Sequence, residues 1–250
     1  MCIRDSSKIN PKIVYASVSA YGPDAPDGHL PGTDAVGQAL SGIAEAYSIP
    51  GNNLRTGVAS VADESCAILT FGGILAAYIN AQKTGKGQKL ETSLVGSAFR
   101  LLGWTMTTAM WSNRPPITGA RINGTRERPG IAACFNDING KPFALQLDPD
   151  DWREAMKALN FFDVLTENGL IDLGLAFESE KKKTEILDKL AELFSTDTRD
   201  NWISVLRKAD MISTHVNTML EASNDPNIKE NNYVTAVSYT HLRAHETRSD

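Results

Sequence analysis

The chain has 250 residues, of which 42% are hydrophobic and 22% charged, a composition typical of a soluble globular protein with ample material for a buried core. Its net charge of −5 argues against a general nucleic-acid binder, because such proteins neutralise phosphates with clustered Lys and Arg. The longest apolar run, Cys66–Ala77, is shorter than the roughly 20 residues needed to cross a bilayer, so we expect no membrane-spanning segment.

The two ends of the chain are related to each other as DNA. Met1–Ser6 can be encoded by a string whose reverse complement, read in a shifted frame, encodes Val237–His241. Both strings also resemble the translated transposon end used in sequencing libraries. We therefore expect residues 1–6 and 237–250 to be artefactual and exclude them from the reasoning about fold. The remaining sequence is then expected to be a fragment that lacks the N-terminal region of a longer gene.

The first natural segment is typical of an α/β domain. Lys12–Ser19 is a nearly continuous apolar run rich in β-branched residues, which predicts a central strand of a parallel sheet, buried on both faces. The loop Gly22–Gly32 that follows is rich in proline and glycine, and open α/β sheets bind ligands in such loops at the carboxyl ends of strands. Thr33–Tyr47 then predicts a short helix.

Two apolar helices and a strand complete the predicted large domain. Glu64–Gln82 is apolar on nearly all sides and predicts a core helix, with Gly72 and Gly73 indicating that another backbone packs closely against its middle. Lys89–Leu94 alternates like a strand, and Ser97–Trp111 predicts a further apolar helix. These elements define a fold class of α/β with a parallel sheet.

Beyond them, the sequence predicts a linker and a small α+β domain. Ser112–Gly130 contains three prolines and several glycines and is typical of a linker. Two strands surround the turn Asn139-Gly140, which is a hairpin signature. The predicted strands are Ile131–Asn136 and Pro142–Asp148, and the predicted helices cover Asp148–Asn160, the positions Ile186, Leu190 and Leu193, and Thr198–Lys208.

Asp63 is the most informative polar residue, because it immediately precedes the apolar helix. One interpretation is a helix N-cap, for which Asp is among the best residues. The other is chemical: backbone N–H groups and the helix dipole favour a charged carboxylate there, and a carboxylate can attack an acyl carbon. The two interpretations are compatible.

The other candidates favour structural roles. Cys66 lies in the first turn of the same helix, where a thiolate is favoured, but no histidine is near it in sequence, so we interpret it as a small core residue. Lys83, Lys86 and Lys89 flank a glycine turn that is not a P-loop and are interpreted as a solvated basic turn. The isolated histidines His29 and His215 and the cysteines provide neither a metal cluster nor a disulfide framework.

An ordered set of motifs then points to a family. It comprises Asn10-Pro11-Lys12-Ile13-Val14-Tyr15-Ala16-Ser17, Tyr21-Gly22-Pro23, Pro31-Gly32-Thr33-Asp34, Gln38-Ala39-Leu40-Ser41-Gly42, Ala62-Asp63, Gly73-Ile74-Leu75-Ala76-Ala77 and Lys83-Thr84-Gly85-Lys86-Gly87-Gln88. This set resembles the family III CoA-transferases, which include formyl-CoA transferase, carnitine CoA-transferase and the α-methylacyl-CoA racemases. The resemblance runs from about Asn10 to Ala236 and is strongest through Leu94.

The resemblance implies a fold and a mechanism. Asp63 falls on the family's nucleophilic aspartate, which forms a mixed anhydride with the donor acyl group and then an aspartyl-CoA thioester. Thr33 and Leu94 fall at positions that line the pantetheine or active-site region in relatives. Acyl-CoA and a small carboxylic acid are the implied substrates, with no tightly bound cofactor. The family also implies a Rossmann-like large domain, an interlocked homodimer and a cytoplasmic location.

Two alternatives remain open. In the racemases a Gly-His-Asp pattern supplies a histidine base, whereas here the pattern is Gly32-Thr33-Asp34, so transferase is preferred over racemase or epimerase. A non-catalytic CoA-binding relative is the second alternative. The glycine-rich loop of formyl-CoA transferase would fall near Asn123-Gly124-Thr125, where the run of glycines is absent.

The expected organisation follows from these assignments. A truncated Rossmann-like large domain occupies residues 7–111, a linker 112–129, the small α+β domain 130–216, and a return linker toward the large domain 217–236. A sheet without its first βαβ units would expose a hydrophobic strand edge and apolar helix faces. We therefore expect the isolated chain to aggregate or to form a loose globule without activity.

Overall fold

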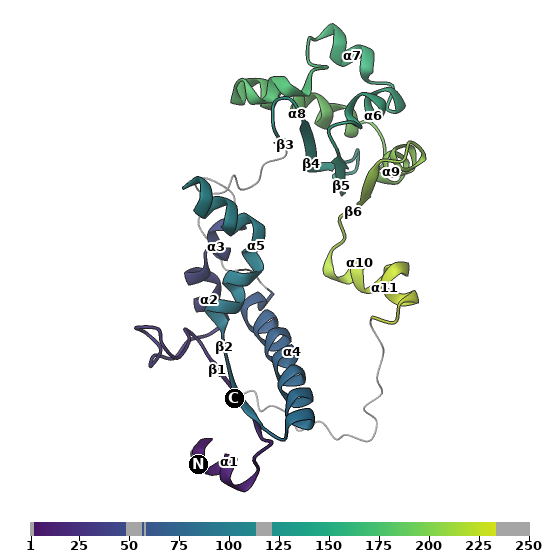
Figure 1. The fold of residues 1–250 in the computed structure, drawn as a ribbon. Coiled ribbons are helices and arrows are strands. Elements are labelled where there is room, and N and C mark those ends of the chain that lie inside the picture. The colour runs from purple at the N-terminus through teal and green to yellow at the C-terminus, as the bar shows by residue number, and fades with distance from the viewer. Residues whose placement is uncertain (1–2, 49–56, 58, 114–121, 234–250) are drawn as a thin grey trace, which may run out of the picture. The chain divides into compact units, whose positions relative to one another are not determined.

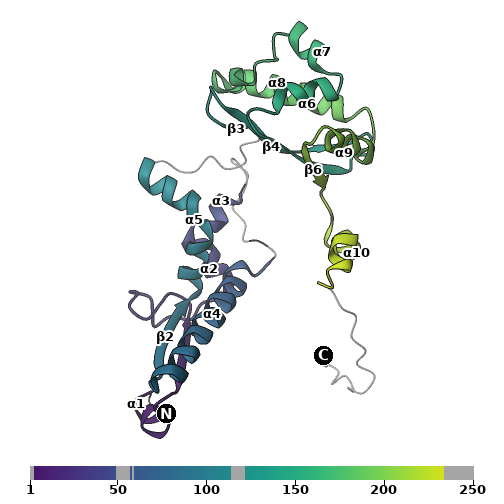
Figure 2. The ribbon, with the colours of Figure 1, turned by 45° about the vertical axis from the view of Figure 1, so that its right-hand side comes forward.

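The protein is described here by a computed structural model covering residues 3–48, 57, 59–113 and 122–233. The chain divides into two compact units, Met1–Gly119 and Ala120–Asp250, each held together by its own contacts. Figures 1 and 2 show the helices and strands of both units in two views.

Unit 1 is built on two parallel strands. β1 (Val14–Ser19) pairs with β2 (Gln88–Ser93) in a register that runs from Val14 opposite Gln88 to Ser19 opposite Ser93. A short helix, α1 (Ile3–Ile9), precedes β1 and includes residues that the sequence analysis assigns to the artefactual end. The parallel pairing confirms the predicted α/β class for this half of the chain.

The predicted burial of β1 on both faces is wrong. Within the described residues β1 pairs with β2 alone, and Tyr15 and Val18 are 37% and 55% exposed. The apolar run does form a strand, but the described residues supply no second neighbour for it. A continuous apolar pattern is typical of a strand with neighbours on both edges and cover on both faces. Because β1 has one neighbouring strand in the described residues, the pattern overestimates its burial.

The predicted helix Thr33–Tyr47 is two helices, α2 (Asp34–Ser41) and α3 (Ile43–Ala46). Gly42 separates them with a φ of 92°, in the left-handed region that residues with a Cβ rarely adopt. α2 packs against both long helices of the unit, and this places it beside their N-termini. In both views α2 lies close to α5 (Leu94–Ser112) (Figures 1 and 2).

The long helix α4 (Val61–Thr84) is less buried than the sequence predicts. It packs against β1, β2, α2 and α5, and its buried residues are mostly small. Phe71 and Ile68 are 62% and 69% exposed, so the prediction of a core helix is wrong for that face. No backbone lies against Gly72 or Gly73 in the described residues: a Cβ on Gly72 would meet nothing within 4 Å, and one on Gly73 would meet the side chain of Leu90.

Among the described residues, α4 is also the helix that is long and apolar enough to cross a membrane. The expectation that no segment reaches that length is therefore wrong. The helix extends beyond the run Cys66–Ala77 on both sides and spans 24 residues, with the charged residues Asp63, Glu64 and Lys83 confined to its two ends. Length and composition alone give weak evidence, because core helices of globular proteins pass the same test.

The helix α5 confirms the second predicted apolar helix, with one difference. Gly103 has φ 39° and ψ −112°, so the helix is interrupted there. Ser93 caps its N-terminus, accepting a hydrogen bond of 3.1 Å from the backbone N–H of Gly96. Leu94, the first residue of α5, packs with Ile43, Ala62 and Ala98 in the small core of the unit.

Unit 2 is an antiparallel sheet covered by helices, which confirms the predicted small α+β domain. Its strands lie in the order β3 (Ile122–Gly124), β4 (Pro129–Asn136), β5 (Pro142–Leu147) and β6 (Ile212–His215). The predicted hairpin is β4 and β5, joined through Gly140 at φ 73°. Asp137 fixes this turn by accepting from the backbone N–H groups of Asn139 and Lys141, both at 2.8 Å.

The helices of unit 2 bury a much larger apolar core than unit 1 does. Phe194 lies at its centre, 4.9 Å from the ring of Phe135, 5.1 Å from Phe143 and 5.6 Å from Trp202. The three predicted helices are present with shifted starts, as α6 (Trp152–Ala158), α8 (Glu180–Phe194) and α9 (Arg199–Lys208). Two short helices between α6 and α8 were not predicted, α7 (Phe162–Glu167) and the 3-10 helix η1 (Leu173–Phe177).

Both predicted linkers contain structure. In the first, Ile122–Gly124 forms β3, which pairs with β4. The chain then turns into β4, with Gly124 at a φ of 87° and a hydrogen bond from the Thr125 N–H to the Arg128 carbonyl. Residues 114–121 lie outside the described residues. The second contains α10 (Met219–Asn224), which begins with a capping box between Thr218 and Glu221, and α11 (Pro226–Glu230).

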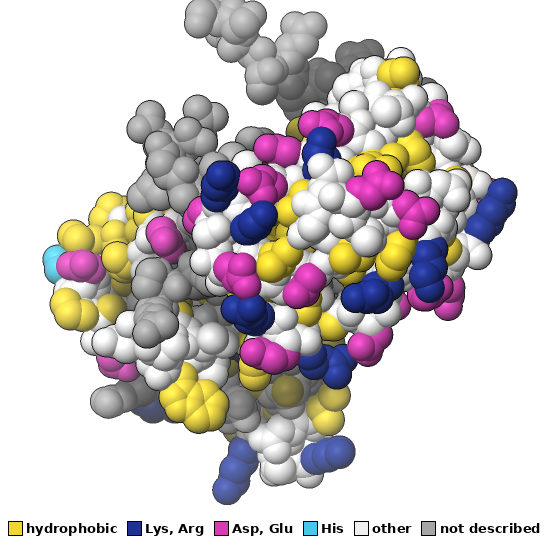
Figure 3. Space-filling view, turned by 90° about the horizontal axis from the view of Figure 1, so that it is seen from above, with side chains coloured by type: hydrophobic (Ala, Val, Ile, Leu, Met, Phe, Trp, Pro, Cys, Tyr) yellow, Lys and Arg dark blue, Asp and Glu magenta, His cyan; other side chains and the backbone are white. Residues whose placement is uncertain are grey.

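Charged side chains of both signs are interspersed over the face seen in Figure 3. In unit 2, ion pairs form along α8, such as Lys189 with Glu192 at 2.7 Å. Exposed pairs of this kind contribute little to stability, about 0 to 1 kcal/mol. That face therefore has no patch of one sign.

Candidate active site

Asp63 lies in the first turn of α4, with an exposed carboxylate. It lines a cavity of about 370 Å³ that is otherwise mostly apolar. Leu94 lines the same cavity, so the structure brings together two of the three predicted site residues. The remaining lining residues are Val18, Cys66, Ala67, Thr70, Phe71 and Ile74.

The interpretation of Asp63 as the N-cap of its helix is wrong. The helix begins two residues earlier, at Val61, and the side chain of the preceding Ser60 makes no capping hydrogen bond. The cap comes from Asp34 at the start of α2: its Oδ1 accepts from the backbone N–H of Ala62 at 2.8 Å and of Asp63 at 3.2 Å. Asp34 thus satisfies two helix N–H groups that have no acceptor within the helix.

A buried glutamine extends this contact. Gln38 is 1% exposed and lies one turn after Asp34 on α2. Its Nε2 donates to Asp34 Oδ2 and, at 3.4 Å, to the carbonyl of Ala59, while its Oε1 accepts from the backbone N–H of Gly57 at 2.6 Å. The two side chains of α2 therefore hold both the start of α4 and the segment that leads into it. Sequence analysis did not identify either residue as functional.

Cys66 is placed as a core residue. Its side chain is 1% exposed, and its Sγ lies 3.6 Å from Thr92 Oγ1 and 3.9 Å from Thr70 Oγ1. The two threonine hydroxyls bond to each other at 2.7 Å. No basic group takes part in these contacts, which supports the interpretation of Cys66 as a packing residue.

Thr33 does not line the cavity of Asp63. It is the N-cap residue of α2, exposed, with extended backbone and without a side-chain capping bond. His29 lies exposed in the loop before it. Neither residue lines the cavity that Asp63 and Leu94 share, and the assignment of Thr33 to CoA binding stays a prediction.

The basic turn lies at the far end of α4. Lys83, in the last turn of α4, lies roughly 30 Å from Asp63 along the helix axis, and Lys86 follows the end of the helix. Lys89 forms an ion pair with Glu91 on β2. These lysines are too far from the Asp63 carboxylate to act on the same reacting atom.

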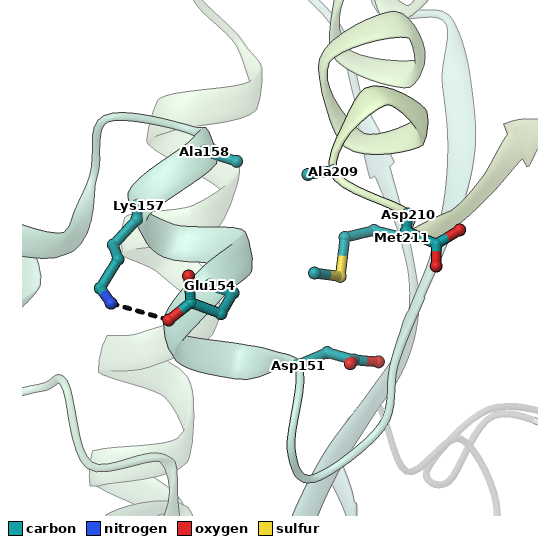
Figure 4. A pocket seen from close by; sticks show the side chains of 7 residues that line it. All are labelled: Asp151, Glu154, Lys157, Ala158, Ala209, Asp210 and Met211. Carbon is teal, nitrogen blue, oxygen red and sulfur yellow. Dashed lines mark hydrogen bonds and ion pairs between the residues drawn. The ribbon is translucent and has the colours of Figure 1, made fainter.

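Unit 2 has cavities of a different character. The one in Figure 4, about 680 Å³, is lined by three carboxylates and by Lys157, which is paired with Glu154 at 2.7 Å. Figure 4 shows Glu154 and Lys157 on one side of the opening and Asp210 and Met211 on the other. Such a lining disfavours the phosphates of a nucleotide. The described residues also contain no group of three or more His, Cys, Asp or Glu that could hold a metal ion.

A second groove in unit 2 includes an acid and a histidine. Asp200 Oδ1 lies 2.6 Å from His215 Nε2, and the hydrogen bond from His215 is the main cause that lowers the pKa of Asp200. Arg207 and Lys208 line the same groove, of about 480 Å³. None of the sequence-predicted site residues Asp63, Thr33 and Leu94 lines this groove.

Comparison with known proteins agrees with the motifs. The family described as CoA-transferase family III matches residues 3–249. Acetyl-CoA:oxalate CoA-transferase of Acetobacter aceti is 32% identical over 141 residues, which are 52% of this chain and 36% of that protein. Human succinyl-CoA:glutarate CoA-transferase is 24% identical over 245 residues, 94% of this chain and 52% of that protein.

Solved structures share the fold. A CAIB/BAIF family protein from Brucella suis superposes with a TM-score of 0.77 at 18% identity, over 93% of this chain and 60% of that one. A hypothetical protein from Mycobacterium tuberculosis gives 0.72 at 17% identity, over 92% and 60%. The chain thus spans between about a third and three fifths of the length of these relatives. By the extent of the family match, the chain belongs to CoA-transferase family III.

Proposed function

We propose that the protein is an acyl-CoA:carboxylate CoA-transferase in which Asp63 is the covalent nucleophile. One observation carries the proposal: Asp63 is an exposed acid that lines a mostly apolar cavity, on a helix turn whose backbone is held by Asp34. The relatives named as CoA-transferases act on acetyl, succinyl and related thioesters, which supports the reaction class.

The chemistry proceeds through four exchanges. An Asp63 oxygen attacks the acyl carbon of the donor thioester, the C–S bond breaks, and CoA leaves as the thiolate. The thiolate attacks the Asp63 carbonyl carbon of the resulting anhydride and releases the donor acid. The acceptor carboxylate then attacks the aspartyl thioester, and the released thiolate attacks the acceptor acyl carbon. Each step replaces one activated acyl bond with another, so no step needs a metal or a redox cofactor.

The surroundings of Asp63 favour this nucleophile over the neighbouring thiol. Cys66 is buried and bonded to threonine hydroxyls, whereas the Asp63 carboxylate is exposed. Apolar neighbours such as Phe71 and Ile74 supply a surface against which the acyl chain of a donor can pack.

The racemase alternative lacks its base at the expected place. Thr33 stands where the racemases carry histidine, and a threonine hydroxyl does not abstract an α-proton at neutral pH. Transfer of CoA between carboxylates is therefore the function that this site favours. A non-catalytic CoA-binding role is kept as an outcome of the test below.

The proposal includes the setting of the enzyme. Acyl-CoA and a small carboxylic acid are its substrates, with CoA bound as a substrate rather than as a resident cofactor. Thr33 and Leu94 are proposed to lie along the pantetheine arm, and Leu94 shares the cavity of Asp63. We further propose a cytoplasmic homodimer, by analogy with the family, that binds neither nucleic acid nor a membrane.

Trapping tests the nucleophile. The complete gene product is incubated with succinyl-CoA or acetyl-CoA and then with hydroxylamine, which converts an acylated aspartate into a hydroxamate that peptide mass spectrometry locates. We expect the hydroxamate on Asp63 and its loss in Asp63→Ala. Glu64→Gln is the matched control, because Glu64 is the adjacent exposed carboxylate in the same helical turn.

The other outcomes each contradict the proposal. Transfer of CoA with an unmodified Asp63 would exclude the covalent mechanism. Exchange of the α-hydrogen of 2-methylacyl-CoA with deuterated water, without transfer to any acid, would favour the racemase. Saturable CoA binding without an adduct from either donor would favour the non-catalytic role.

A further inference from the structure

We propose that Asp34 and Gln38 form a positioning pair that fixes the first turn of α4 and thereby the direction of the Asp63 carboxylate. This inference rests on the proposed function of Asp63. Neither residue lines the cavity. Asp34 acts through the backbone N–H groups of Ala62 and Asp63, and Gln38 acts through Asp34. Both residues lie on α2, which packs against α4.

The N–H groups of the first turn of α4 are all accounted for. Val61 donates to the carbonyl of Ala59 and Glu64 to that of Ser60, both at 2.8 Å, so these two bonds stay within the local segment. The other two N–H groups, those of Ala62 and Asp63, bond to Asp34 Oδ1. The orientation of the nucleophile's own peptide group therefore depends on a side chain 29 residues away in sequence.

Burial makes this contact costly to lose. Ala62 is 0% exposed, so water does not replace Asp34 as the acceptor for its N–H without a change in packing. A charged acceptor at a helix N-terminus also interacts favourably with the helix dipole. Removing the carboxylate leaves a buried donor unsatisfied directly beside the nucleophile.

Gln38 sets the orientation of the pair. A carboxylate only accepts hydrogen bonds, so Asp34 Oδ2 requires the Nε2 end of the Gln38 amide, and the Oε1 end then faces Gly57. The same amide group thus connects Asp34 to the chain segment that enters α4. A displacement of about 1 Å at a reacting group can cost about 100-fold in rate, so small shifts of this turn matter.

The chemistry of the pair suggests a set of four variants. Asp34→Ala removes the acceptor. Asp34→Asn keeps the acceptor for Ala62 and Asp63 but places an amide donor against the donor of Gln38. Gln38→Glu places two carboxylates together. The double variant Asp34→Asn with Gln38→Glu restores a donor facing an acceptor, and the second oxygen of Glu still accepts from Gly57.

The measurement is the rate of hydroxamate formation at Asp63 in the complete gene product, with succinyl-CoA and acetyl-CoA as donors. We expect Asp34→Ala to lower the rate about 100-fold while the KM for the donor changes less than about threefold. Gln38→Glu and Asp34→Asn should each lower it less, and the double variant should recover most of the loss. Glu45→Gln, at an exposed acid on α3, is the matched control and should keep the wild-type rate.

Amide hydrogen exchange gives a second readout that does not depend on the reaction. Exchange at Ala62 and Asp63 should accelerate in Asp34→Ala and return toward the wild-type rate in the double variant. A wild-type adduct rate in Asp34→Ala would overturn the inference, and so would failure of the double variant to recover both readouts.

The proposed function can fail separately. A wild-type protein without any adduct on Asp63 would remove the catalytic meaning of the pair and so overturn the inference as stated. The exchange rates at Ala62 and Asp63 would still report whether Asp34 caps α4, so this failure is distinguishable from a failure of the cap.

Discussion

Gly37 lies directly against Ala62: a Cβ atom on Gly37 would stand 2.6 Å from the Cβ of Ala62 and 3.2 Å from that of Leu94. The missing side chain lets α2 approach the N-terminal turns of both α4 and α5. Asp34 and Gln38 flank Gly37 on the same helix, so this close approach brings them within bonding distance of the turn that carries Asp63.

Gly37→Ala should destabilise unit 1. The added methyl group overlaps Ala62 on a second helix, and overpacking of this kind costs about 1 to 3 kcal/mol. Gly72→Ala is the matched control, since it adds the same methyl group to a helix where nothing lies within 4 Å. That control should be stabilising by about 0.5 to 1 kcal/mol, because alanine loses less backbone entropy on folding. Denaturant unfolding measures both, and equal free energies for the two variants would contradict the assigned packing.

Cys66→Ala and Asp63→Ala should have opposite effects on activity and stability. Cys66 is buried in the packing of α4, so its replacement should cost about 1 kcal/mol of stability and leave transfer largely intact. Asp63→Ala should abolish transfer, while the exposure of its side chain predicts little change in stability. Steady-state transfer assays and thermal unfolding of both variants check this. Loss of transfer in Cys66→Ala with activity retained in Asp63→Ala would move the nucleophile to the thiol.

Asp137 should make unit 2 sensitive to acid. Burial opposes its ionisation, but hydrogen bonds from the backbone N–H groups of Arg199, Lys141 and Asn139 outweigh this and hold the pKa of Asp137 below its ordinary value of 3.8. The carboxylate therefore stabilises the fold above the unfolded pKa, and this stability is lost as the pH falls through the lower folded value.

Asp137→Asn should reduce the unfolding free energy of unit 2 at neutral pH and flatten its acid limb below about pH 4. Asp188→Asn, at an exposed position of α8, is the control and should leave both unchanged. Urea titrations at several pH values, followed through the fluorescence of Trp152 and Trp202, give the comparison. An acid limb in Asp137→Asn as steep as that of the wild type would contradict the role of this carboxylate.

Local patterns predicted the elements that depend on local chemistry. The strand at Val14–Ser19, the hairpin turn at Gly140 and the capped helix after Thr198 all follow from runs of a few residues, and the structure contains each of them. The α/β class followed from the order of such elements. The position of Asp63 near the start of an apolar helix was also visible from neighbouring residues, although the helix begins at Val61.

Relations between distant segments were not predictable in the same way. The cap of α4 comes from Asp34 on another helix, so a rule about the residue next to the helix start assigned it to the wrong aspartate. The predicted burial of β1 and α4 was wrong for a related reason. An apolar pattern indicates a face that needs cover, but it does not identify the segment that covers it. The short strand β3 depends on pairing with β4, which its own residues do not signal.

Oxygen labelling tests the central claim, the covalent role of Asp63, most directly. In the proposed exchange the acceptor carboxylate donates one oxygen to Asp63 each time its acyl group passes to CoA. The complete gene product is therefore allowed to turn over succinyl-CoA with glutarate, or acetyl-CoA with oxalate, in which both oxygens of the reacting carboxylate are ¹⁸O, and the peptide containing Asp63 is weighed. The account predicts that this peptide gains one ¹⁸O in the first turnover and at most two after many turnovers, and that the peptides of other carboxylates gain none. Transfer of CoA to the labelled acid with Asp63 unlabelled would contradict it.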